Sequence, residues 1–142
     1  MERSLVLIKP DAMHTGLGGA IISRLERLGL KIVAMKMLHM DGTMAEKHYA
    51  VHKGKPFFDS LVRFMTSAPI MALVLEGEGA VDRIRREMGA TDPAKAEPGT
   101  IRAEFGQDVQ RNAVHGSDSP ETAEKEIALF FSEEELFSPG NQ

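Results

Sequence analysis

The chain has 142 residues, a formal net charge of −4 and no cysteine. The net negative charge argues against a general nucleic-acid or anionic-membrane partner, and the absence of cysteine excludes disulfides and thiolate zinc sites. The composition, 42% hydrophobic and 27% charged, is typical of a globular protein, and the length fits one domain spanning residues 1–142.

The apolar run at residues 5–8 ends at Lys9. It is too short for the core of an export signal, and no run approaches the ~18 apolar residues that a membrane helix needs. We therefore expect a cytoplasmic protein without a membrane partner.

Strands and helices alternate along the sequence. The hydrophobic pattern predicts strands at residues 5–8, 30–40 and 70–75, with a short fourth strand near Val114. It also predicts a turn at 16–19, a helix from there to Gly29, helices at 43–51, 57–66 and 80–88, and a last helix from Pro120. This order predicts an α+β fold, with helices packed on one face of an antiparallel sheet.

Two of these helices have recognisable start signals. Thr43 with Glu46 forms a capping-box pattern at the helix 43–51. Ser119 is a favourable cap for the last helix, and Pro120 suits its first position.

Residues 91–114 show no clear helical or strand period. Loops of this length are uncommon inside compact domains and are often functional. The segment contains Arg102, Arg111 and Asn112 and leads directly to His115, so we interpret it as functional rather than as a surface insertion.

His115 lies just before the start of the last predicted helix. A neutral imidazole is nucleophilic near physiological pH, and a helix N-terminus offers free N–H groups to phosphate oxygens. Glu126, inside that helix, is placed to reach back and orient the imidazole through a hydrogen bond to one ring nitrogen. Taken alone, a histidine beside a capping motif is more often structural than catalytic.

The basic candidates also have structural alternatives. Lys9, at the end of the first strand, is either a solvated stop or a phosphate ligand that projects into a cleft. On the helix 80–88, Arg85 borders the apolar stripe and is well placed to lean into a cleft. Arg83 and Arg86 are expected to point away, on a solvated face.

Two aromatic residues lie near these candidates. Phe57 is off the best apolar stripe of its helix, where it either stacks on a nucleobase or is partly buried in the core. Tyr49 is either a hydrogen-bond donor to phosphate or a packed helix residue.

Two further motifs are discounted. His48 and His52 have a spacing that can hold a metal, but the glutamate of a zinc-protease motif is missing between them and no third ligand is evident. The turn at residues 16–19 resembles a phosphate-binding turn, yet the sequence contains neither nucleotide-binding glycine fingerprint.

Taken together, these residues resemble the nucleoside diphosphate kinase family over essentially the whole chain, from Leu5 to Phe131. The segment Asn112-Ala-Val-His115-Gly-Ser-Asp-Ser119 matches the family's active-site signature, which is highly specific. Other segments agree in order and spacing: Leu5-Val-Leu-Ile-Lys9-Pro-Asp-Ala, His48-Tyr49, Pro56-Phe57-Phe58, Thr91-Asp-Pro-Ala and Pro98-Gly-Thr-Ile-Arg102.

The resemblance implies a ping-pong reaction. His115 would take the γ-phosphoryl group of a nucleoside triphosphate and pass it to a nucleoside diphosphate, with Glu126 orienting His115 and Ser117 supporting that arrangement. Phe57 and Val109 would hold the base by stacking, which explains broad base tolerance because every base has a π-face. The implied contacts to phosphates or sugar are Lys9, Tyr49, Arg85, Thr91, Arg102 and Asn112, and Lys9 is also implied in catalysis.

The resemblance further implies a ferredoxin-like sandwich with a four-stranded antiparallel sheet. Mg²⁺ would bridge phosphate oxygens with few or no direct protein ligands. The expected partners are nucleoside triphosphates, nucleoside diphosphates and further copies of the chain, commonly in a hexamer and in some bacterial members a tetramer. The short polar tail from Phe137 onward can contribute to such differences in assembly.

Two alternative functions remain from the sequence. A nucleic-acid-binding ferredoxin-like module would need a basic, aromatic sheet face, whereas the strands here are mostly aliphatic. A phosphohistidine carrier without nucleotide turnover would not need the triphosphate ligands implied at Arg85, Thr91, Arg102 and Asn112.

Overall fold

The computed structural model describes residues 1–138. Four strands form one sheet in the order β2-β3-β1-β4, and every pair is antiparallel. The strands are β1 (Glu2–Ile8), β2 (Lys31–Leu38), β3 (Ile70–Gly77) and β4 (Val114–Gly116). Helical crossovers join β1 to β2 and β3 to β4, so the predicted four-stranded, ferredoxin-like α+β fold is confirmed.

Helices connect and cover these strands. The α-helices are α1 (Pro10–His14), α2 (Gly18–Glu26), α3 (Gly42–His48), α4 (Phe58–Met65), α5 (Ala80–Met88), α6 (Ile101–Phe105) and α7 (Pro120–Phe130). Short 3₁₀ turns are found at Ala50–His52, Pro93–Lys95 and Glu133–Glu135.

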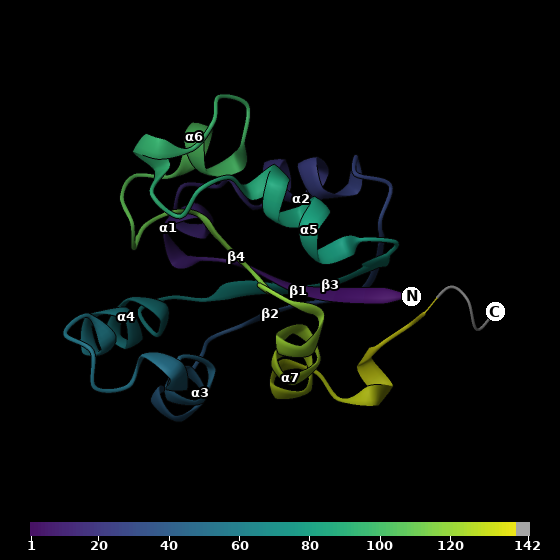
Figure 1. Ribbon diagram of the computed structural model, residues 1–142. Coiled ribbons are helices and arrows are strands. Elements are labelled where there is room, and N and C mark those ends of the chain that lie inside the picture. Colours follow the sequence, from purple (N-terminus) through teal and green to yellow (C-terminus); the bar gives the residue numbers. More distant parts are fainter. Residues whose placement is uncertain (139–142) are drawn as a thin grey trace.

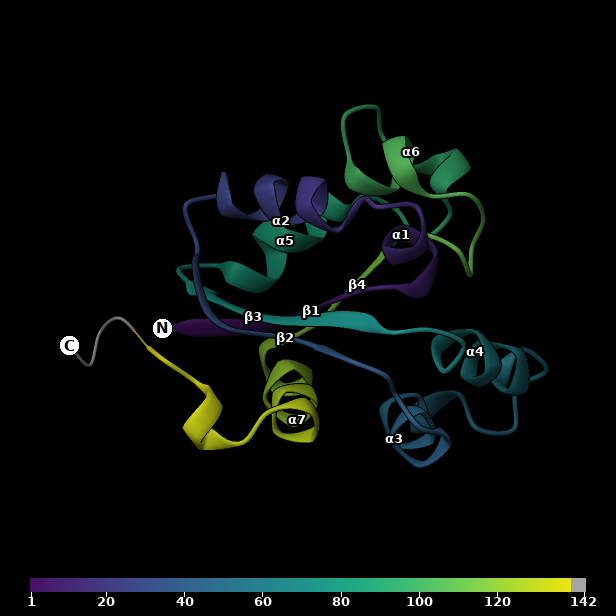
Figure 2. The ribbon, with the colours of Figure 1, turned by 180° about the vertical axis from the view of Figure 1, so that it is seen from behind.

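Both faces of the sheet are covered, so the prediction of helices on one face is wrong. Helices α2 and α5 lie over one face, and α3 and α7 lie over the other (Figures 1 and 2). The reason is visible in β1, where Leu5 and Leu7 belong to one apolar cluster and Val6 and Ile8 to a second. Because side chains alternate along a strand, an uninterrupted apolar run needs cover on both sides.

Several predicted boundaries change in the structure. The first strand begins at Glu2 rather than at residue 5, and the turn predicted at 16–19 gives way to α2 at Gly18. The capping box at Thr43 is wrong, because the Asp41 side chain accepts the cap hydrogen bond from Met44 N at 2.8 Å. Aspartate is at least as good a cap as threonine, so α3 starts at the earlier residue.

The stretch 91–114 is not an irregular loop throughout. It contains α6, which begins after Thr100, whose hydroxyl accepts a hydrogen bond from Ala103 N at 3.3 Å. Ile101 is fully buried in the same cluster as Val6 and Ile8. A helix of five residues is too short to show a period in the sequence.

Within residues 1–138, no helix is both long and apolar enough to cross a membrane. At the C-terminal end, Phe137 N donates a hydrogen bond of 2.8 Å to Val33 O on β2. The remainder of the polar tail, residues 139–142, lies outside the described residues.

Candidate active site

Pairing between β1 and β4 brings the first strand's end beside His115. Leu7 is opposite His115 and Ile8 is opposite Val114 in the antiparallel register. The next residue, Lys9, donates its backbone N–H to Ala113 O at 2.9 Å. Segments more than 100 positions apart in the sequence therefore meet at one edge of the sheet, where a cleft of about 1350 Å³ opens.

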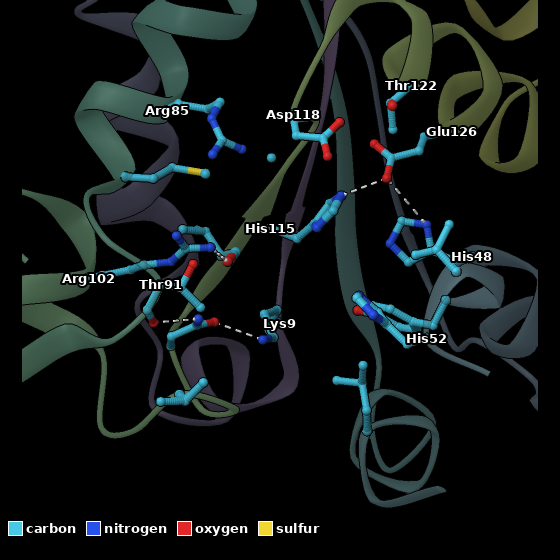
Figure 3. A pocket seen from close by; sticks show the side chains of 18 of the residues that line it. Lys9, His48, His52, Arg85, Thr91, Arg102, His115, Asp118, Thr122 and Glu126 are labelled. Carbon is cyan, nitrogen blue, oxygen red and sulfur yellow. Dashed lines mark hydrogen bonds and ion pairs between the residues drawn. The ribbon is translucent and has the colours of Figure 1, made fainter. Parts of the chain in front are cut away.

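This cleft gathers predicted site residues that lie far apart in the sequence, among them Lys9, Arg85 and His115 (Figure 3). Its volume exceeds the ~300–1,000 Å³ typical of small-molecule pockets, so a phosphorylated nucleoside fits. Ser117 is fully buried behind the cleft and does not line it. The predicted residues that do line it are Lys9, Tyr49, Phe57, Arg85, Thr91, Arg102, Val109, Asn112, His115 and Glu126.

A short hydrogen-bonded chain holds the His115 ring. Its Nε2 lies 3.0 Å from Glu126 Oε2, and Ser117 Oγ donates to Glu126 Oε1 at 2.6 Å. Burial raises the pKa of Glu126, but the hydrogen bonds from His115 and Ser117 outweigh burial and hold the pKa below its ordinary value. Since an ionised carboxylate only accepts, Nε2 carries the proton and the imidazole lone pair is on Nδ1.

Lys9 is an almost buried cation in the cleft wall, only 6% exposed. Its Nζ donates to Asn112 Oδ1 and to Gln110 O, both at 2.7 Å. Asn112 Nδ2 in turn donates to Thr91 O at 2.9 Å, which ties Lys9 to the segment after α5. Burial lowers the pKa of Lys9 to about 8, so the ammonium is still charged at neutral pH.

Arg102 provides a second buried cation. Its guanidinium donates to Gly89 O at 3.0 Å and to Val114 O at 2.8 Å, and its Nε has no hydrogen-bond partner among the described residues. Burial, together with nearby Arg85, lowers the pKa of Arg102 to about 10. Two cations held by backbone carbonyls leave positive charge available to a ligand.

Of the three arginines on α5, one side chain lies where the sequence predicts and the other two do not. Arg85 points from α5 into the cleft (Figure 3). Arg86 also lines the cleft, so the prediction that it points away is wrong; its long side chain reaches past its own helix face. Arg83 does not line the cleft, but it is not simply solvated, because it donates hydrogen bonds to the carbonyls of Leu28 and Glu78.

The chain makes a strained turn just before His115. Ala113 has φ 76°, the one positive value among described non-glycine residues, and Val114 N donates to Asn112 O at 2.9 Å. This combination defines a γ-turn of the rare, strained form. Asp11 Oδ2 accepts a hydrogen bond from Ala113 N at 3.0 Å and so stabilises the turn.

Sequence reasoning missed this role of Asp11. The residue stands two positions after Lys9, in a segment to which the sequence assigns no task beyond the family resemblance. Its carboxyl is largely buried, and burial raises its pKa despite the nearby Lys9 charge. An acidic residue shortly after a buried strand was the available signal, but its partner is about a hundred residues away.

His48 was also missed as a neighbour of His115. The two rings pack edge to face with centroids 4.7 Å apart, and burial lowers the pKa of His48 to about 3. His48 Nδ1 lies 3.8 Å from Glu126 Oε2. The discounted pair does not form a site of its own, because His52 Nδ1 instead contacts Lys55 Nζ at 3.4 Å.

The remaining predicted residues line the outer and inner parts of the cleft. Phe57 and Val109 are 46% and 58% exposed, so each presents apolar surface at the rim. Tyr49 is buried, and burial raises its pKa, which keeps the phenol protonated as a hydrogen-bond donor. The cleft thus combines apolar rims with a cationic interior.

Comparison with known proteins identifies the class. The family model described as Nucleoside diphosphate kinase matches residues 2–136. A nucleoside diphosphate kinase of Dehalococcoides mccartyi is 57% identical over 96% of both chains. One of Archaeoglobus fulgidus is 58% identical over 96% of this chain and 90% of its own.

Solved structures of nucleoside diphosphate kinases are also similar to this chain. The nucleoside diphosphate kinase of Aquifex aeolicus has a TM-score of 0.92 and 46% identity, covering 95% of this chain and 98% of its own. That of Halobacterium salinarum, in complex with CDP, has a TM-score of 0.94 and 49% identity, covering 96% of this chain and 91% of its own. These matches place the chain in a class of nucleotide-binding phosphotransferases. The chain belongs to the nucleoside diphosphate kinase family.

Proposed function

We propose that the protein transfers the γ-phosphoryl group of a nucleoside triphosphate to a nucleoside diphosphate through a phosphohistidine at His115. One observation carries the proposal. Glu126 accepts from Nε2 of His115 at 3.0 Å, which leaves the lone pair on Nδ1 in a cleft lined by Lys9 and Arg102. A nucleophile so oriented needs no change of tautomer before attack.

The two half-reactions are mirror images. In the first, the Nδ1 lone pair attacks the γ-phosphorus, and the bond to the β–γ bridging oxygen breaks, so the nucleoside diphosphate leaves with that electron pair. In the second, a β-phosphate oxygen of another nucleoside diphosphate attacks the phosphorus, and the N–P bond breaks and returns the lone pair to Nδ1. Glu126 stabilises the positive charge that develops on the imidazole during the first step.

Charge stabilisation supports the remaining assignments. Phosphoryl transfer depends mainly on positioning and on neutralising the equatorial oxygens. Lys9, Arg85 and Arg102 would supply cations, because all three line the same cleft. Neutral donors for phosphate or sugar oxygens would come from Tyr49, Thr91 and Asn112, which also line it.

Broad base tolerance is part of the proposal. Phe57 and Val109 lie on the rim, and apolar surface there would sandwich a base without reading its edges. The CDP complex of the Halobacterium salinarum relative is consistent with a pyrimidine base in a site of this kind.

Kinases of this family generally require a divalent cation, and we propose Mg²⁺. The donor set of the cleft fits a cation held mainly by substrate phosphates, because Glu126 is committed to His115 and Ser117. Asp118 faces the cleft beside His115 (Figure 3), and it would assist the hydrated ion. When bound, Mg²⁺ would neutralise phosphate charge and orient the leaving group.

Assembly into a homo-oligomer, a hexamer or a tetramer, is likewise proposed. Strand β2 is at the edge of the sheet, and its Met35 and Met37 are 49% and 61% exposed. A long edge strand with exposed apolar side chains favours association with another copy.

The alternatives from the sequence are less well supported. Helices lie over both sheet faces in residues 1–138, and the strands carry mostly aliphatic side chains rather than the basic, aromatic face that nucleic-acid binding would need. Steady-state kinetics test the proposal. A carrier would show no nucleotide turnover, whereas a ping-pong reaction requires parallel double-reciprocal plots at several acceptor concentrations. Intersecting lines would mean direct transfer in a ternary complex and would refute the phosphohistidine route.

A further inference from the structure

Three metal-ligating side chains converge beside the reactive ring. His48, His115 and Glu126 each offer one donor atom within 4.8 Å of the other two. Glu126 Oε2 lies 3.0 Å from His115 Nε2 and 3.8 Å from His48 Nδ1. Figure 3 shows the two rings and the carboxylate turned toward one another.

His48 is the unexplained member of this cluster. Its side chain is only 1% exposed, yet neither ring nitrogen has a hydrogen-bond partner among residues 1–138. Buried imidazole nitrogens are normally paired, and an unpaired one destabilises the protein unless a ligand satisfies it. The proposed phosphoryl transfer assigns no task to His48.

We propose that nucleotide-free protein binds a borderline-soft divalent transition metal, of which Zn²⁺ is the type, through His48 Nδ1, His115 Nε2 and Glu126 Oε2. Tetrahedral zinc with ligands at ~2.0–2.1 Å requires donor atoms roughly 3.3 Å apart, and the two measured separations lie on either side of that value. Two histidines and one glutamate form a common zinc ligand set, with the fourth position open to water.

The surroundings of the cluster suit such a site. Ser117 Oγ donates to Glu126 Oε1 at 2.6 Å, so the carboxylate is held by an outer hydrogen bond of the kind that orients metal ligands. All three ligands line the cleft, which gives the ion a path of entry and room for a water. Hard Mg²⁺ prefers oxygen ligands and would not compete for the two imidazoles.

Binding would inhibit the enzyme, a consequence that rests on the proposed function. A metal on Nε2 takes the lone pair there, so the ring proton moves to Nδ1 and the nucleophile is lost. The ion also separates Glu126 from His115. Zn²⁺ is therefore expected to inhibit phosphoryl transfer, while the site itself is tested without any nucleotide.

The test measures Zn²⁺ and Co²⁺ binding to nucleotide-free protein after chelator treatment. Calorimetry should give one Zn²⁺ per chain, and Co²⁺ should give the visible absorption of a tetrahedral complex. His48→Gln should weaken binding at least 10-fold, whereas His52→Gln, which changes another histidine of the same cleft, should stay within about 2-fold. Equal binding by the parent protein and His48→Gln would overturn the proposal.

A second measurement covers the case in which His48→Gln does not fold. In the parent protein, the imidazole NMR signals of His48 and His115 should shift or broaden on addition of Zn²⁺, and those of His14 and His39 should not. Shifts confined to other histidines would contradict the site. Zn²⁺ binding that leaves phosphoryl transfer unchanged would overturn the inhibition, whereas failed transfer with Mg²⁺ alone would count against the proposed function.

Discussion

Lys9 is the residue whose ionisation most directly affects the cleft. Burial lowers its pKa to about 8 from an ordinary value of 10.5. The ammonium is present below that pKa and is lost as the pH rises through it. A phosphate ligand that depends on this charge therefore meets a weaker site in mild alkali.

We predict that kcat/KM falls above about pH 8, because kcat/KM reports the ionisation of the free enzyme. The total loss of transition-state stabilisation should approach the ~2–4 kcal/mol that is typical of one electrostatic donor. A pH–rate profile checks this, with Lys9→Met as the control whose alkaline limb should be absent. A parent profile that is flat from pH 7 to 9 would contradict the role of Lys9.

Asp11 controls the backbone rather than the ligand. Replacing it with alanine leaves the buried Ala113 N–H without its acceptor, in a turn that is already strained. We predict that Asp11→Ala lowers the free energy of unfolding by about 1–3 kcal/mol and lowers kcat more than it raises KM. Urea unfolding and steady-state kinetics measure the two effects.

Asp11→Asn is the matched control, since it keeps an acceptor oxygen and should retain most of the stability. If Asp11→Ala is as stable and as active as the parent, the turn before His115 does not depend on this hydrogen bond.

At this scale the sequence predicted the residues of the cleft but not all of their contacts. His115 and Lys9 could be singled out from local signals. His115 stands just before a predicted helix start, and Lys9 stands at the end of a predicted strand. Asp11 and His48 could not, because their partners Ala113 and His115 are far away in the sequence. Local sequence patterns do not predict contacts between residues that are far apart in the sequence.

Helix α7 carries Glu126, and its start is set by one hydroxyl. Ser119 Oγ accepts a hydrogen bond from Thr122 N at 3.1 Å, and Pro120 occupies the first position, as predicted. We predict that Ser119→Ala costs about 1 kcal/mol of stability, measured as a lower urea midpoint with an unchanged m-value. Ser119→Asp should stay within a few tenths of a kcal/mol of the parent, and equal loss in both variants would exclude capping as the cause.

Long helices and strands with a clear hydrophobic period were predictable from the sequence, and short ones were not. The helix at Ala80–Met88 was predicted with its observed ends, because Val81, Ile84 and Met88 repeat on one face. Helices α1 and α6, of five residues each, were missed since neither completes two turns. Such short helices are stabilised by tertiary packing, and the helix propensity of their residues does not predict that packing.

In the whole molecule, exposed apolar side chains lie on the edge strand β2. Met35 and Met37 project from edge strand β2, so we predict that the double variant Met35→Glu, Met37→Glu shifts the protein toward smaller species in sedimentation velocity. Ala128→Glu, at an exposed position of α7, adds a carboxylate elsewhere and should leave the distribution unchanged. An unaffected distribution in the double variant would exclude this edge as an interface.

For the whole molecule, the order of strands and helices along the chain was predictable, but the placement of helices on both faces of the sheet was not. Alternating strands and helices indicated the α+β class, while the two-sided burial of β1 became clear only from its two clusters. A run of four apolar residues fits either a one-sided or a two-sided strand.

The proposed reaction requires that the phosphoryl group pass through His115 Nδ1. Incubation with a γ-labelled nucleoside triphosphate and Mg²⁺, without acceptor, tests this requirement. We expect an acid-labile, base-stable label on His115 that moves to an added nucleoside diphosphate and is absent in His115→Ala. Bound nucleotide with no labelled protein, or label that persists in His115→Ala, would contradict it.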